Sequence, residues 1–171
     1  MLRVYTFEEF MDDFTPLEWE DFLEEEQEVR KIIDDVRQRG DKALRDFAHR
    51  FDGVTLESLT VSPQEIEEAR QAVGEKFLSA LKNIKERIVS FHQRQKAESW
   101  TVTRPHGEIV GQKVTPLEKV GLYIPGGSAP YPSTVLMTAL PAQEAGVEEI
   151  YITTPAGEGG RVSPYILAAA G

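Results

Sequence analysis

The sequence predicts an α/β protein in which helices and a hairpin come first and a parallel strand–helix–strand unit follows. Three observations support this class. Apolar residues recur at helical spacing through most of residues 17–97. Short strand-like runs begin near residue 100, and from residue 120 strand and helix patterns alternate as in a βαβ unit, which favours a parallel sheet.

The first hundred residues carry the signals of four helices. They are expected at Leu17–Arg39, Asp41–Phe51, Pro63–Val73 and Glu75–Ala97. Gly40 ends the first helix, and Asp41 is expected to act as the N-cap of the second. The stretch Ser62-Pro63-Gln64-Glu65 has the form of a capping box, with proline at the first helical position, where its missing N–H costs nothing.

Strand signals then replace the helical period. Trp100–Arg104 and Glu108–Val114 flank a Pro-His-Gly turn and predict a hairpin. Val120–Ile124 is a short continuous apolar run, typical of a strand covered on both faces. Glu149–Thr154 predicts a second strand, parallel and adjacent to Val120–Ile124.

Two helices accompany these parallel strands. Pro132–Ala145 is mostly apolar and connects the two strands, although Pro141 predicts a kink or break within it. Val162–Ala170 begins a further helix. A sheet of two parallel strands does not close a core, so we expect the chain to be the front part of a longer protein. Ile150, Ile152 and Ile166 are then expected to be poorly covered.

Composition excludes several classes. The chain has 171 residues, 40% of them hydrophobic, which suffices for a core. It contains no apolar run of the roughly 20 residues that a membrane helix needs and no secretory leader, so a cytoplasmic protein is expected. The absence of cysteine excludes disulfides and thiolate ligands. The net charge of −10 argues against nucleic acid as a partner, because phosphate binding requires a cationic surface.

The negative charge is concentrated at the N-terminus. Residues 1–30 contain 11 acidic and 2 basic residues, a net charge of −9. The cluster is either a solvated helical face, the more common role of a charge run, or an acidic docking arm.

One loop is suited to a ligand. After Val120–Ile124, the Pro125-Gly126-Gly127 turn lies where open α/β sheets bind ligands, beyond the carboxyl end of a strand. Glycine permits close backbone approach, Tyr123 can stack on a ring, and hydroxyls follow at Ser128, Ser133 and Thr134. A nucleotide or another small anion fits such a loop. A plain strand-to-helix turn explains the glycines equally well, and neither standard phosphate-binding motif is present.

These residues also carry a resemblance. VGLYIPGGSAPYPSTVLMTALPAQEAGVEEIYITTP resembles the signature region of the histidinol dehydrogenase family. Upstream, DDVRQRGDKALRDFAHRFDGV, IVSFHQRQ followed by SW, and GQKVTPLEKVGLY resemble the same family in the same order. The resemblance covers nearly the whole chain from about residue 25.

The resemblance implies a chemistry. The family oxidises L-histidinol through an aldehyde to L-histidine in two NAD-dependent steps of histidine biosynthesis. A bound zinc orients the substrate, a Glu-His pair moves protons, and a partner chain completes the active site of a homodimer. The zinc ligands and the Glu-His pair are expected beyond residue 171, so no catalytic residue is assigned within this sequence and the fragment alone is expected to be inactive.

Site and domain assignments follow from the same resemblance. The NAD-contacting tyrosine of the family corresponds to Tyr123, with Pro125, Gly126 and Gly127 as its backbone neighbours. The implied architecture is Rossmann-like, as in aldehyde dehydrogenases. The expected divisions are an N-terminal helical arm (residues 1–20), the front of a first α/β domain (21–118) and the start of a second, Rossmann-like domain (119–171).

The residues themselves offer no metal site. The three histidines, His49, His92 and His106, lie far apart on different predicted elements, without the close spacing of a zinc site. Two alternatives remain open at this point. The chain is part of a same-family dehydrogenase for another alcohol, or it is a stand-alone, non-catalytic binding domain.

Overall fold

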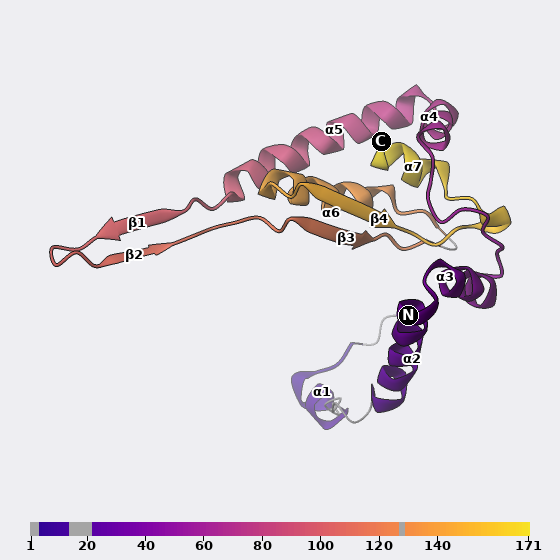
Figure 1. Ribbon diagram of the computed structural model, residues 1–171, viewed down its shortest axis with the longest axis horizontal. Coiled ribbons are helices and arrows are strands. Elements are labelled where there is room, and N and C mark those ends of the chain that lie inside the picture. Colours follow the sequence, from indigo (N-terminus) through magenta and orange to yellow (C-terminus); the bar gives the residue numbers. More distant parts are fainter. Residues whose placement is uncertain (1–3, 14–21, 127–128) are drawn as a thin grey trace. The chain divides into compact units, whose positions relative to one another are not determined.

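The computed structural model describes residues 4–13, 22–126 and 129–171. The chain divides into two compact units, Met1–Leu44 and Arg45–Gly171. Figure 1 identifies the helices and strands of both. Leu17, Gly127 and Ser128, which the sequence assigned to a helix and to the ligand loop, lie outside the described residues.

Helices make up the described part of the first unit. They are α1 (Phe7–Asp13), α2 (Leu23–Arg39) and the beginning of α3 (Asp41–Phe47). The helix predicted to end at Arg39 is confirmed over its described part, and Gly40 follows it with a φ of 57°. The capping role predicted for Asp41 is wrong. The amides of Ala43 and Leu44 donate to the Gly40 carbonyl, so Asp41 is already the first helical residue.

Local polar contacts stabilise α1 and α2. At the start of α1, the Glu9 carboxylate accepts from the Thr6 amide at 2.8 Å, and the Thr6 hydroxyl accepts from the Glu9 amide at 3.2 Å. This capping box lowers the pKa of Glu9, because both the backbone and the side chain of Thr6 donate to its carboxylate. Along α2, arginines pair with acids one turn earlier: Arg30 with Glu26, Arg37 with Asp34, and Arg39 with Asp35.

The second unit contains α4 (Pro63–Ala72) and α5 (Glu75–His92), which begin where the sequence predicted. The predicted capping box is present, since the Ser62 amide donates to Glu65 at 2.7 Å and the Glu65 amide donates to the Ser62 hydroxyl at 3.2 Å. α5 ends at His92 rather than at Ala97. None of the helices in the described ranges has both the length and the apolar character that a membrane crossing requires.

The predicted hairpin is confirmed. β1 (Trp100–Thr103) and β2 (Ile109–Gln112) pair antiparallel, with Thr103 opposite Ile109. The turn between them contains Gly107 at a φ of 83°, a conformation that favours glycine. Every residue of both strands is exposed, and Figure 1 shows the ribbon as an extension between α5 and β3.

The parallel unit is also confirmed. It consists of β3 (Lys119–Tyr123), α6 (Pro132–Ala145), β4 (Glu149–Thr153) and α7 (Pro164–Ala170). The two strands pair in parallel, from Lys119 opposite Glu149 to Tyr123 opposite Thr153. α6 continues through Pro141 as one helix, so the predicted break does not occur. Contacts of α6 with α5, α7 and both strands hold it in place despite the missing hydrogen bond.

The core lies between this small sheet and its helices. Ile124, Val135 and Ile166 are almost fully buried there, and Ile152 packs against them. The expectation that Ile166 is poorly covered is therefore wrong, because α7 turns its apolar face inward. Ile150 and Ile152 are half-buried.

Within the described residues of the second unit, helices cover one face of the β3–β4 sheet. Along β3, the half-buried positions Val120 and Leu122 alternate with exposed ones. α6 contacts both strands, whereas Tyr123 and Tyr151 point to the opposite face and are exposed. The prediction of a strand covered on both faces is therefore wrong for this chain. Strand alternation, rather than the apolar run, decides which side chains are buried.

Candidate functional site

The carboxyl ends of β3 and β4 meet at one edge of the sheet. The last paired residues are Tyr123 and Thr153, and the Ile124 amide donates to the Thr153 carbonyl at 2.8 Å. Beyond this bond, the segment that follows β3 continues as Pro125-Gly126, and the segment that follows β4 continues as Thr154-Pro155. The predicted ligand loop therefore begins where an open parallel sheet places its ligands.

Tyr123 is accessible at this edge. The residue is 64% exposed, and its side chain lies on the sheet face opposite the one that α6 contacts. Gly121 precedes it on the same face, and a Cβ built on that glycine meets nothing within 4 Å. Tyr123 is thus exposed beside a position without a side chain, and its ring can stack on a planar group.

Gly126 has a packing reason of its own. A Cβ at this position would lie 3.3 Å from Cδ of Pro155 and 3.5 Å from Oγ1 of Thr154. The first of these is a tight contact and the second an ordinary van der Waals contact, so a larger residue would require Pro155 to shift by a few tenths of an ångström. Glycine at 126 keeps the two loops close together. Pro125, beside it, is exposed, and Gly127 lies outside the described residues.

Thr154 was not among the residues that the sequence pointed to. Its hydroxyl is buried and has no hydrogen-bond partner among the described residues. A buried unpartnered hydroxyl costs free energy on the order of 1–3 kcal/mol, which a ligand or water can recover. The Thr-Thr-Pro sequence at a strand end was the available signal, because it places hydroxyls at the same sheet edge as Tyr123.

The helix that follows the loop carries the other predicted hydroxyls. Ser133 is exposed in the first turn of α6, and Thr134 is half-buried. Tyr131, at the N-cap position, makes no side-chain hydrogen bond to the first turn. The loop thus leads into a helix start without a side-chain cap.

A polar network occupies the amino end of the uncovered sheet face. The Lys119 ammonium lies 2.6 Å from the Glu149 carboxylate, which also accepts from the Tyr151 hydroxyl. Lys119, and then Tyr151, lower the pKa of Glu149 by stabilising its charged form. The same hydrogen bond raises the pKa of the Tyr151 phenol. A tyrosine phenol is already protonated at neutral pH, and this hydrogen bond favours that form further.

The described residues do not fit a zinc site. They contain no group of three or more His, Cys, Asp or Glu side chains that could hold a metal ion. His49 lies in the π-helical turn after α3, His92 ends α5, and His106 lies in the hairpin turn. The structure brings none of these histidines together.

Comparison with known proteins identifies the family. A family model described as histidinol dehydrogenase matches residues 18–171. The chain belongs to the histidinol dehydrogenase family. Histidinol dehydrogenase of Geobacillus kaustophilus is 48% identical over 147 residues, which are 86% of this chain and 35% of the relative. That of Symbiobacterium thermophilum is 45% identical over 172 residues, which cover 99% of this chain and 39% of the relative.

A solved structure agrees with this assignment. The crystal structure of histidinol dehydrogenase from Elizabethkingia anophelis matches with a TM-score of 0.84 and 33% identity, over 97% of this chain and 38% of that one. The chain thus spans little more than a third of the length of these relatives, and it corresponds to their N-terminal part. The family assignment made from the sequence is confirmed.

Proposed function

We propose that this chain supplies the N-terminal part of an enzyme that oxidises L-histidinol to L-histidine in two NAD-dependent steps of histidine biosynthesis. The family match over residues 18–171 carries the proposal. The accessible Tyr123 beside the predicted ligand loop supports it, because the loop lies at the sheet edge that binds nucleotides in open α/β folds.

The proposed NAD site consists of Tyr123, Pro125, Gly126 and Gly127. Tyr123 offers its exposed ring for stacking, and Gly126 keeps the adjoining loops close enough to present backbone groups. NAD, when bound, accepts the hydride that leaves the substrate carbon. The chain's own residues bind and orient the cofactor; none of them is proposed to move a proton.

Zinc is proposed for the complete enzyme only. The described residues do not fit a metal centre, so its ligands and the proton-transferring Glu-His pair are assigned to the remaining two thirds of the family's chain. No step of the reaction is assigned to residues 1–171. We therefore propose that this chain alone does not reduce NAD and binds no stoichiometric zinc.

The proposal includes an organisation. Residues 1–20 form a helical arm, 21–118 the front of a first α/β domain, and 119–171 the start of a Rossmann-like domain of the aldehyde-dehydrogenase type. The complete enzyme is a cytoplasmic homodimer. The parallel β3–β4 pair with its connecting α6 supports the Rossmann-like interpretation, since such folds begin with this unit.

A fusion tests the function. The fusion enzyme is this chain followed by the remaining residues of the Geobacillus kaustophilus relative. A bacterium that lacks histidinol dehydrogenase should grow on L-histidinol when it expresses the fusion enzyme. The purified fusion enzyme should produce NADH from L-histidinol in a zinc-dependent manner. We expect the 171-residue chain to do neither. NADH production by the chain alone, at verified mass and purity, would contradict the proposal.

The same assay separates the alternatives. In the complete natural protein, NADH production from another alcohol but not from L-histidinol would identify a different substrate. The complete protein is used because the fusion enzyme takes its zinc ligands and Glu-His pair from a histidinol dehydrogenase. A folded fusion enzyme without any dehydrogenase activity, beside a stable monomeric 171-residue chain, would favour the stand-alone binding domain.

A further inference from the structure

A half-open cavity lies on the helical side of the second unit. It has a volume of about 600 Å³ and lies between α5, α6 and α7, with Ile152 of β4 at its floor. Val135 and Leu140 of α6 add to the apolar floor. The cavity is separate from the described residues of the proposed cofactor site, because Tyr123, Pro125 and Gly126 are not part of its lining.

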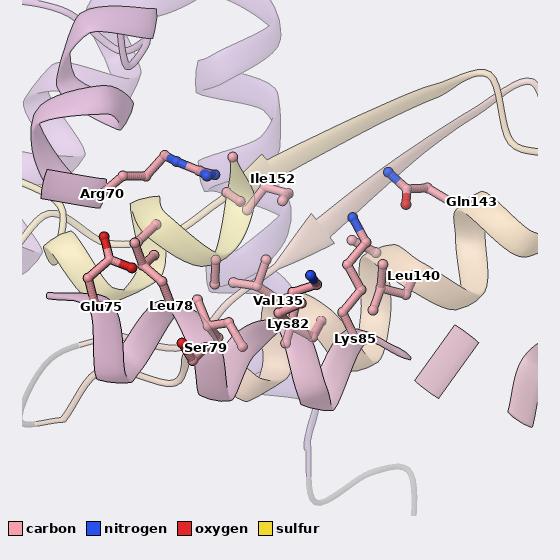
Figure 2. A pocket seen from close by; sticks show the side chains of 17 residues that line it. Arg70, Glu75, Leu78, Ser79, Lys82, Lys85, Val135, Leu140, Gln143 and Ile152 are labelled. Carbon is pink, nitrogen blue, oxygen red and sulfur yellow. The ribbon is translucent and has the colours of Figure 1, made fainter. Parts of the chain in front are cut away.

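Cationic side chains surround this apolar floor. Arg70, Lys82 and Lys85 line the cavity, against a single acid in the described lining, Glu75. Figure 2 shows Arg70 and Lys85 extending toward Ile152 from opposite sides. Within the described part of the chain none of the three cations has an ion pair, whereas the arginines of α2 are paired. Three unpaired cations beside one acid favour an anionic occupant.

Small side chains line the other wall. Ala139 of α6 and residues 168–171, three alanines and Gly171, border the cavity. Gly171 lies close against α4, since a Cβ on it would be 2.5 Å from Cγ2 of Ile66. A wall of small side chains lets another backbone approach closely.

The length of the relatives identifies the source of that segment. The Elizabethkingia anophelis structure shares this fold with a TM-score of 0.84, but only 38% of that chain is matched. Most of a full-length relative must therefore pack against surfaces of the matched part or lie apart from it. An apolar cavity with unpaired cations is a surface of the second unit that is suited to receive it.

We propose that this cavity is the docking site of a segment from the remaining two thirds of a full-length histidinol dehydrogenase, and that this segment pairs a carboxylate with Lys82 and Lys85. The proposal rests on the proposed function for its choice of occupant. Apolar side chains of the segment would cover Val135, Leu140 and Ile152, while the carboxylate neutralises the rim.

Single thiols test the proposal, because the chain contains no cysteine of its own. Ala139→Cys and Ala169→Cys place a thiol in the cavity lining, and Ser90→Cys places a control thiol at an exposed position of α5 outside this lining, in a second and shallower hollow. Alkylation rates by iodoacetamide are compared between the 171-residue chain and a fusion enzyme whose other cysteines are removed. We expect at least a tenfold slower reaction at positions 139 and 169 in the fusion enzyme, and no change at position 90.

A charge reversal tests the carboxylate. Lys82→Glu with Lys85→Glu should return the alkylation rate at position 139 of the fusion enzyme toward that of the 171-residue chain. Arg87→Glu with Arg94→Glu makes the same charge change on α5 and its following turn, outside the lining of this cavity, and should leave the rate unchanged. Equal effects of the two double variants would overturn the ionic part of the proposal.

The outcomes separate this inference from the function. An active fusion enzyme with unprotected thiols at positions 139 and 169 overturns the docking site and leaves the function standing. Protected thiols in a folded but inactive fusion enzyme support the docking site and count against the function. Protection in the 171-residue chain that grows with its concentration would identify a second copy as the occupant and overturn the proposal.

Discussion

Replacing Tyr123 with alanine in the fusion enzyme should weaken NAD binding about 15-fold. A tyrosine side chain presents roughly 200 Å², and 64% of Tyr123 is exposed, so on the order of 130 Å² is available to a ligand. If a stacked ring covers about half of that area, its loss costs about 1.6 kcal/mol at 25 cal/mol per Å². At about 1.4 kcal/mol per factor of ten, this corresponds to an NAD affinity that is about 15-fold weaker.

Calorimetric titration of NAD measures the effect, and zinc affinity serves as an internal reference that should not move. Tyr151→Ala is the matched control. Tyr151 lies on the same uncovered face and is 59% exposed, but it is bonded to Glu149 near the amino end of the sheet. We expect less than a twofold change in NAD affinity for this variant. Unchanged NAD affinity in a folded Tyr123→Ala enzyme would remove Tyr123 from the site.

Other predictions concern stability and assembly. Ile124→Ala should lower the free energy of unfolding by about 2–5 kcal/mol in urea denaturation, because Ile124 is fully buried; Ile109→Ala, in the exposed hairpin, should change it by less than about 0.5 kcal/mol. The pKa of Glu65 is lowered by hydrogen bonds from Ser62, so this carboxylate stabilises the fold above its unfolded pKa and ceases to do so as the pH falls through the folded one. Glu65→Gln should therefore flatten the loss of stability below about pH 4.5 in acid titrations, and an unchanged acid limb would refute this. Deleting residues 1–20 from the complete enzyme should shift it toward monomer in sedimentation; an intact dimer would favour the solvated-face interpretation of the acidic cluster.

Local signals predicted the helix starts well where a side chain caps its own turn. The Ser62–Glu65 box is an example, because both of its hydrogen bonds join residues three apart. Thr6–Glu9 follows the same pattern, since threonine followed three residues later by glutamate is a standard signature of a helix start. Asp41 shows the limit of this reasoning. The preceding helix ends at Arg39 and the next begins at Asp41, so Gly40 between them occupies the N-cap position.

The candidate site was predictable in position but not in detail. Tyr123 precedes a proline–glycine turn at a strand end, and that order alone indicates the sheet edge. Thr154 could not be ranked in the same way, because its burial depends on how closely Gly126 and Pro155 approach across the two strand ends. The sequence likewise did not indicate that Arg70, Lys82 and Lys85 line one cavity, because in the sequence they are ordinary helical surface residues.

The sequence by itself determined the family, the order of the elements and the parallel βαβ connection. These follow from the periodicity of side chains and from residue identities in one short region. Only the tertiary structure decided which faces are covered. Ile166 is buried because α7 packs on α6 and α4. Tyr123 is exposed because α6 and α7 contribute to the core on the other side of the sheet. Coverage depends on contacts between residues far apart along the chain, which no local pattern records.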